Sequence, residues 1–123
     1  MKFCILVPAM LVLVLLGCTT APSDVPVDPS YATDVQPIFS ANCITCHGTS
    51  SPSGGYSLTS YAGATGGGSD SVPNVIAGSA DSSKLYRKVE GIETPQMPYG
   101  QPPLDSVKLE TAENWINKGA KNN

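Results

Sequence analysis

The chain of 123 residues has little charge and few aromatic side chains. Asp, Glu, Lys and Arg make up 14% of it, and Phe, Trp and Tyr make up 7%. Seven Lys and Arg against ten Asp and Glu give a formal net charge of −3 without a basic block, so nucleic-acid binding is not expected. An apolar content of 41% excludes a charge-rich disordered chain. The length fits one domain.

Glycine and proline are abundant by comparison, with 12 and 11 residues. This composition predicts that loops occupy much of the fold. A small, loop-rich chain with few large apolar side chains needs an additional source of core. Four cysteines and a single histidine are the residues that could hold one.

Residues 1–17 are predicted to be a signal peptide. Lys2 precedes an apolar run from Phe3 to Leu16, which is too short to span a bilayer and is typical of a secretory h-region. The sequence Leu15-Leu16-Gly17-Cys18 resembles the lipobox of bacterial lipoproteins. In that family the chain is cut before the cysteine, and the thiol carries a diacylglycerol. Cys18 is therefore the predicted lipidation site; the alternative is an ordinary secretory signal with a chance cysteine.

Residues 18–32 are predicted to be a lipid-anchored tether, followed by a folded domain over residues 33–123. Pro22, Pro26 and Pro29 lie among small and acidic residues, which favours extended chain without a packed core. At ~3.1 Å per residue, residues 19–32 would reach roughly 40 Å. The alternative is a strap that lies across the surface of the domain.

The segment Cys43-Ile44-Thr45-Cys46-His47 has the C-x-x-C-H spacing of c-type haem attachment. Two thiols three residues apart at a helix end can add to the two vinyl groups on one porphyrin edge, and His47 is then delivered to the iron. Thr33-Asp34-Val35-Gln36 predicts the start of the preceding helix, with Thr33 as N-cap. The predicted cofactor is one haem c, attached through Cys43 and Cys46.

Three other roles for Cys43 and Cys46 fit less well. A thioredoxin-like redox pair requires a βαβ context, and the sequence shows none. A structural zinc site requires four ligands, whereas the mature chain offers two thiols, His47 and carboxylates. A plain disulfide leaves the adjacent histidine without a role.

Met97 is the predicted sixth ligand of the iron. His47 is the only histidine, and the other methionines, Met1 and Met10, lie in the predicted signal peptide. Met97 is in the proline-flanked segment Thr94-Pro95-Gln96-Met97-Pro98, a poor place for a flexible core residue. A lysine ligand or an open iron site is the alternative.

These motifs together resemble class I c-type cytochromes over residues from about 33 to 120. The resemblance rests on the C-x-x-C-H motif, on the later Met97-Pro98, and on the closing Trp115-Ile116-Asn117-Lys118-Gly119-Ala120. It implies an all-α fold of short helices and long loops around one haem, with His47 and Met97 as axial ligands. It also implies that a proline carbonyl, from Pro52 or Pro73, accepts the histidine N–H.

Two later helices and one irregular segment complete the expected domain. A helix over 84–89 is predicted to be capped by Ser79 or Asp81 and to end at Gly91. The last helix is predicted from Asp105 or Ser106 to about residue 118 and, in the resemblance, crosses the first helix near Phe39. The Gly- and Ser-rich residues 49–78 are interpreted as an insertion around one haem edge.

The expected function is one-electron transfer outside the cytoplasm, periplasmic or at the cell surface, and not enzymatic catalysis. The expected partners are a redox protein donor and acceptor, and a membrane through the N-terminal diacylglycerol. The alternatives are a haem-based small-ligand sensor, a peroxidatic domain with a labile sixth ligand, or a fixed electron-entry subunit of a larger enzyme. The cations of the mature chain form a docking patch if they cluster at the haem edge; they are Lys84, Arg87, Lys88, Lys108, Lys118 and Lys121.

Overall fold

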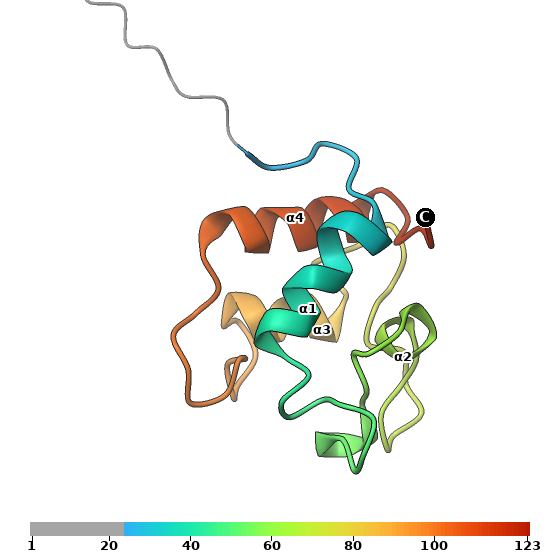
Figure 1. Cartoon of the computed structure of the whole chain (residues 1–123), viewed down its shortest axis with the longest axis vertical. Coiled ribbons are helices and arrows are strands. Elements are labelled where there is room, and N and C mark those ends of the chain that lie inside the picture. Colours follow the sequence, from blue (N-terminus) through green and yellow to red (C-terminus); the bar gives the residue numbers. More distant parts are fainter. Residues whose placement is uncertain (1–23) are drawn as a thin grey trace, which may run out of the picture.

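The computed structural model describes residues 24–123, so the predicted signal peptide and the predicted lipidation site Cys18 lie outside the described residues. The elements in chain order are a π-helical turn η1 (Tyr31–Val35), α1 (Gln36–Asn42), a 3-10 turn η2 (Ser53–Gly55), α2 (Tyr61–Thr65), α3 (Lys84–Glu90) and α4 (Ser106–Asn117) (Figure 1). Within residues 24–123 the only extended pairing is an isolated bridge between Gly67 and Pro73. The predicted all-α fold is confirmed. No helix in this range is both long and apolar enough to cross a bilayer.

The first helix begins earlier than the sequence predicts. Ser30 precedes its first turn, and the Ser30 N–H donates to Oδ2 of Asp34 at 2.7 Å. Asp34 thus supplies the carboxylate that favours a helix N-terminus, and the predicted Thr33 cap is wrong. Val35 N–H donates to the Ser30 carbonyl, five residues back, at 3.2 Å. This wider turn precedes Pro37, which has no N–H to continue the regular pattern.

Helix α4 crosses η1 and α1, and aromatic rings fill the crossing (Figure 1). The Trp115 ring lies 5.5 Å from Tyr31, 6.5 Å from Phe39 and 6.4 Å from Tyr61, measured between centroids. The Trp115 Nε1–H donates to the Lys121 carbonyl at 2.9 Å, so its polar atom is satisfied. The expected crossing near Phe39 is confirmed, with Trp115 in the core.

The chain before η1 packs on α4, as a surface strap would. The Pro26 carbonyl accepts from Nδ2 of Asn114 at 3.0 Å, and Pro29 is fully buried. Ala32 N–H donates to the carbonyl of Asn123 at 3.0 Å. We call residues 26–30 the strap. The packed region therefore extends upstream of residue 33, where the composition placed the start of the domain.

The two later helices are bounded by recognisable caps. Helix α3 ends at Gly91 as predicted, with a left-handed φ of 88°. Its N-cap is Ser83, so the predicted caps Ser79 and Asp81 are wrong. The Ser83 hydroxyl is engaged elsewhere, because it accepts from Ile76 N–H and donates to the Ser79 carbonyl, both at 2.8 Å. Helix α4 begins as predicted after Asp105, whose Oδ1 accepts from Lys108 N–H at 2.9 Å.

The aromatic crossing yields a prediction about stability. Trp115→Ala should lower the free energy of unfolding by about 3–5 kcal/mol, because it empties a site that is 1% exposed. Urea unfolding of the haem-loaded protein, followed by far-ultraviolet circular dichroism, measures the loss. The control Val107→Ala, on the same helix at a position 40% exposed, should change it by less than about 0.5 kcal/mol. A loss below about 1 kcal/mol for Trp115→Ala would contradict the role given to this ring.

Candidate functional site

A cavity of about 1190 Å³ lies among α1, α3, the start of α4 and the long loops. Its volume exceeds the roughly 300–1,000 Å³ usual for small-molecule pockets, so it has room for a large flat cofactor. All four residues predicted to hold the haem line this cavity: Cys43, Cys46, His47 and Met97. The structure therefore brings together two segments that lie about fifty residues apart in the sequence.

The two thiols lie on the turn that ends α1. Cys43 N–H donates to the Phe39 carbonyl at 2.9 Å, and the Cys43 carbonyl accepts from Cys46 N–H at 3.1 Å and from His47 N–H at 2.9 Å. Cys43 is half-buried and Cys46 is exposed, and neither forms a disulfide. Burial, with a further contribution from Cys46, raises the pKa of Cys43 to about 11. The helix end thus presents both sulfur atoms and the imidazole to one cavity.

The imidazole of His47 is oriented by a main-chain carbonyl. Nδ1 of His47 lies 2.8 Å from the carbonyl oxygen of Tyr56. A carbonyl only accepts, so Nδ1 carries the proton and Nε2 is left with the lone pair that a metal requires. The Tyr56 ring also packs edge-on against the imidazole, with centroids 5.7 Å apart.

The expected proline carbonyl is therefore replaced by that of Tyr56. The Pro52 carbonyl accepts from Gly55 N–H at 2.9 Å, and Pro73 pairs with Gly67 in the isolated bridge. Both prolines are thus engaged in local turns, and the expectation for Pro52 or Pro73 is wrong. Sequence reasoning missed Tyr56 because a main-chain acceptor leaves no side-chain signal.

The Gly- and Ser-rich segment positions Tyr56 by packing backbone against backbone. Gly54 has a φ of 63°, and the Gly68 backbone lies so close that a Cβ there would stand 2.4 Å from the Gly54 carbonyl oxygen. The Tyr56 hydroxyl donates to the Ala64 carbonyl at 2.6 Å, and burial raises the pKa of that hydroxyl. This segment forms one wall of the cavity, through Tyr56, Leu58 and Gly68 among others.

Met97 reaches the cavity on a loop that is fastened to α3. Met97 N–H donates to the Lys88 carbonyl at 2.9 Å, and Nζ of Lys88 donates to the Thr94 carbonyl at 2.5 Å. Glu93 forms an ion pair with Arg87 and lies 3.5 Å from Lys88. These contacts hold both ends of the short loop, so the Met97 thioether is presented to the cavity by fixed backbone.

The cavity suits a covalent haem in both lining and donor set. Its inner walls are apolar and include Phe39, Leu58, Leu85, Val89 and Leu104, all of them buried. An imidazole with a free Nε2 and a thioether form the axial pair found in cytochromes c. No group of three or more His, Cys, Asp or Glu side chains within residues 24–123 is arranged to hold a metal ion, so this range offers no four-ligand zinc site.

The lysines that line the cavity each face a carboxylate. Lys84 lies 3.3 Å from Asp70, and Lys108 lies 2.7 Å from Asp105. The pKa of Asp70 is lowered by the Val72 N–H and by Lys84, and the pKa of Asp105 is lowered by hydrogen bonds from Lys108. Lys88 faces Glu93 in the same way. The positive charges of these three lysines at the cavity are thus offset by nearby carboxylates, which the expected cationic patch did not include.

The comparisons with known proteins agree with this geometry. Residues 43–99 match the family model described as Planctomycete cytochrome C. The matched stretch begins at Cys43 and includes Cys46, His47 and Met97. Comparisons with curated proteins and with solved structures gave no match. The family match supports a cytochrome c-type domain in these residues and suggests haem-based electron transfer.

Proposed function

We propose that this protein is an exported one-electron carrier with a single haem c, attached through Cys43 and Cys46 and ligated by His47 and Met97. The observation that carries the proposal is the convergence of these four side chains on one apolar cavity. The family match over residues 43–99 supports the broader part, haem-based electron transfer. The donor and acceptor are proposed to be redox proteins.

The side chains around the cavity each have a defined task. When bound, the haem supplies a couple between ferric and ferrous iron, which takes up or releases one electron. His47 donates its Nδ1–H to Tyr56 and keeps Nε2 available on the proximal side. The Met97 thioether, a soft ligand, favours the reduced iron and raises the reduction potential relative to a second histidine.

Rigidity of the chain around the cavity suits electron transfer. The segments that carry His47 and Met97 are each held by backbone hydrogen bonds, to Leu58 N–H at 2.8 Å and to the Lys88 carbonyl at 2.9 Å. Buried apolar walls exclude water, which would otherwise reorient whenever the charge of the iron changes. Neither feature requires a side chain to make or break a bond during the cycle.

Membrane attachment through Cys18 is the second part of the proposal. Its support is the Leu15-Leu16-Gly17-Cys18 motif after an apolar run, together with the match to a class of domain that is usually exported. A diacylglycerol supplies two acyl chains, which hold a protein at a bilayer far more firmly than a single chain does. The carrier would then work as a lipid-anchored protein outside the cytoplasm.

Covalent attachment is tested by removing the thiols. The purified protein should carry the mass of one haem, and it should stain for haem on a denaturing gel. The double variant Cys43→Ala/Cys46→Ala should lose covalent haem completely, because no thioether can form. Cys18→Ala, which also removes one cysteine, should keep the full haem mass. Haem that remains covalently bound in the double variant would contradict attachment at these two residues.

The sixth ligand is tested by optical spectroscopy of the ferric protein. A coordinated Met97 should give the weak far-red sulfur-to-iron charge-transfer band and should slow the binding of cyanide or imidazole. Met97→Ala should abolish the band, lower the reduction potential and open the iron to both ligands, while covalent haem survives. Ile92→Ala, an exposed change after α3 at a residue that does not line the cavity, should leave all three properties unchanged.

A wild-type protein without the band that binds cyanide freely at neutral pH would show that Met97 is not a ligand. The sensor or peroxidatic alternative would then replace the carrier, since an accessible iron is what those functions need.

A further inference from the structure

We propose that the strap orients the anchored domain with the outer side of α4 toward the membrane and the cavity mouth toward the aqueous compartment. The redox partner that docks at the mouth is then a water-soluble protein or domain. This inference rests on the lipid at Cys18 that the proposed function includes. It adds the direction in which the site faces and the class of partner that can reach it.

The strap belongs to the folded domain and fixes where the chain leaves it. The Pro26 carbonyl accepts from Asn114 on α4 at 3.0 Å, and Asp28 lies 3.6 Å from Lys121. The Ser30 hydroxyl donates to the Asn123 carbonyl at 2.8 Å, next to the fully buried Pro29. Pro26, on the outer side of α4, is thus the strap residue nearest the N-terminus that a hydrogen bond holds, and Asp24 lies beside Val107 and Lys108 at a small cavity.

The length that remains between Cys18 and Pro26 restricts the orientation. The eight residue steps from Cys18 to Pro26 can span at most about 29 Å when fully extended. The 100 described residues imply a radius of gyration of about 13 Å, and hence a diameter of about 33 Å for a uniform sphere. If the domain were inverted, Pro26 would lie about a diameter above the bilayer, beyond the reach of residues 19–25. A tether that stayed free over residues 19–32 would reach more than about 40 Å and would permit inversion.

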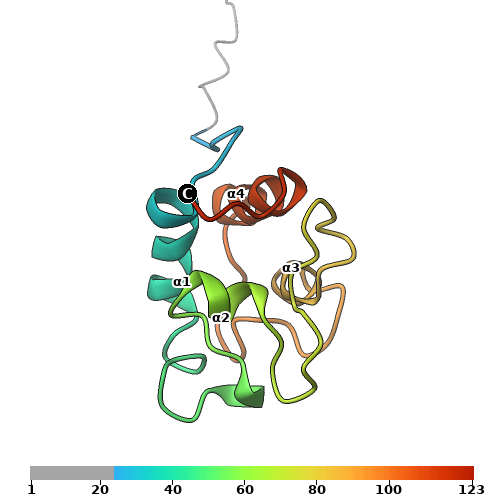
Figure 2. The same cartoon turned by 90° about the vertical axis from the view of Figure 1, so that its right-hand side faces the viewer.

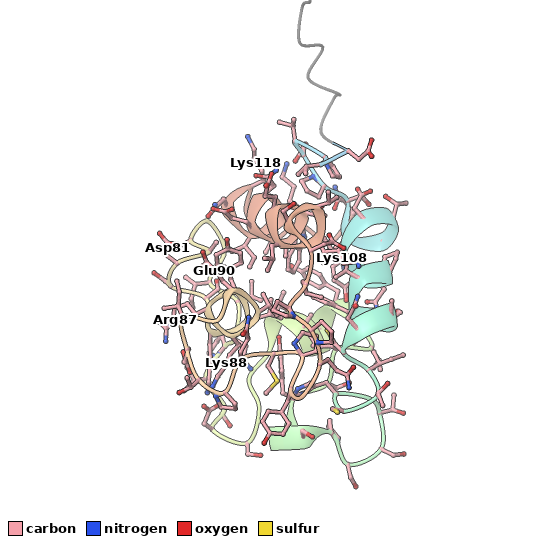
Figure 3. The ribbon with its side chains drawn as sticks, turned by 90° about the vertical axis from the view of Figure 1, so that its left-hand side faces the viewer. Asp81, Arg87, Lys88, Glu90, Lys108 and Lys118 are labelled. Atoms are coloured by element: carbon pink, nitrogen blue, oxygen red, sulfur yellow. The ribbon has the colours of Figure 1, made fainter. Side chains whose placement is uncertain are left out.

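The strap lies at one end of the molecule and residues 43–58, which carry both thiols and His47, lie at the other, with the cavity extending from there to Lys108 and Ala112 of α4 (Figures 1 and 2). Figures 1 and 2 show α4, the strap and the C-terminus at the top, and residues 43–58 at the bottom. Figure 3 shows Lys118 near the strap and Lys88, which lines the cavity, in the lower half together with the sulfur atoms. An orientation with the strap end toward the lipid thus turns the end that carries both thiols and His47 away from it.

The two ends also differ in surface chemistry. Val27 in the strap is 76% exposed, and the exposed Lys118 pairs with no carboxylate of residues 24–123. The exposed Val27 suits contact with a membrane, whereas the exposed Asp24, Asp28 and Glu110 on this side offset the charge of Lys118, so apolar contact and the short tether, not charge, favour this orientation. At the cavity mouth Tyr99 is 71% exposed, and the lysines face carboxylates, so this end offers little to anionic lipid. An exposed aromatic ring among balanced charges instead suits contact with another protein.

The orientation can be measured with one added cysteine at each end. One variant is Lys118→Cys, at the strap end (Figure 3). The other is Gln101→Cys, at an exposed residue that lines the cavity. In the haem-loaded lipoprotein Cys43, Cys46 and Cys18 are blocked, so the added thiol alone takes a fluorescent donor. The protein is inserted in phosphatidylcholine and phosphatidylglycerol vesicles with an acceptor on the lipid headgroups. Donor lifetimes with and without acceptor give the transfer efficiency for each site, corrected for quenching by the haem.

We expect at least twofold higher transfer efficiency from position 118 than from position 101. Ten Gly and Ser residues inserted between Asp24 and Val25 should bring the two values together, since the longer tether permits inversion. Equal or higher transfer from position 101 in the unmodified chain would overturn the orientation and leave the carrier function intact. Cys18→Ala should give transfer at neither site. If the protein with Cys18 intact also shows no energy transfer and stays in solution, the proposal of a lipid anchor is wrong, and the proposed orientation is wrong with it.

Discussion

The crossing of α4 over the first helix is the contact on which the rest of the structure depends. Trp115 fills it together with Tyr31, Phe39 and Tyr61, and the two helices have few other apolar side chains of that size. The crossing ties the two ends of the folded domain, and the roughly forty residues between α1 and α3, which include η2 and α2, fold between these ends. The cavity lies between this crossing and the segments that carry His47 and Met97.

The candidate site is held mainly by the backbone, which explains how so irregular a chain can position the two side chains proposed as iron ligands. His47 is oriented by the Tyr56 carbonyl, and the Met97 loop is held by the Lys88 carbonyl. Neither contact depends on the length or rotamer of a neighbouring side chain. A chain rich in glycine, proline and serine can therefore reach the precision of a more regular fold, provided that its main-chain donors and acceptors meet.

The sequence predicted the features that are local and missed those that depend on contacts between distant segments. The C-x-x-C-H spacing and the caps at Asp105 and Gly91 are readable because each is set within a few residues. Met97 was singled out by elimination, since Met1 and Met10 lie in the predicted signal peptide, and the structure places it at the cavity, while its role as a ligand stays a prediction. Tyr56 acts through a carbonyl that every residue possesses, and the strap has the composition of a free linker. The partner of Lys84, Asp70, lies fourteen residues away on a different loop, so no local pattern predicts it, whereas Asp105 lies only three residues from Lys108.

The close approach of Gly68 to Gly54 has a consequence for how this chain tolerates change. A methyl group at position 68 would overlap the Gly54 carbonyl oxygen, and Gly54 lies inside the 3-10 turn that leads directly into Tyr56. The displacement would pass along two residues to the acceptor of His47. By contrast, a Cβ at Gly78 would meet nothing within 4 Å, although the φ of 86° there still favours glycine. In this Gly- and Ser-rich stretch, Gly68 therefore affects the orientation of the His47 ring without touching it, whereas Gly78 is constrained only by the backbone conformation of its own turn.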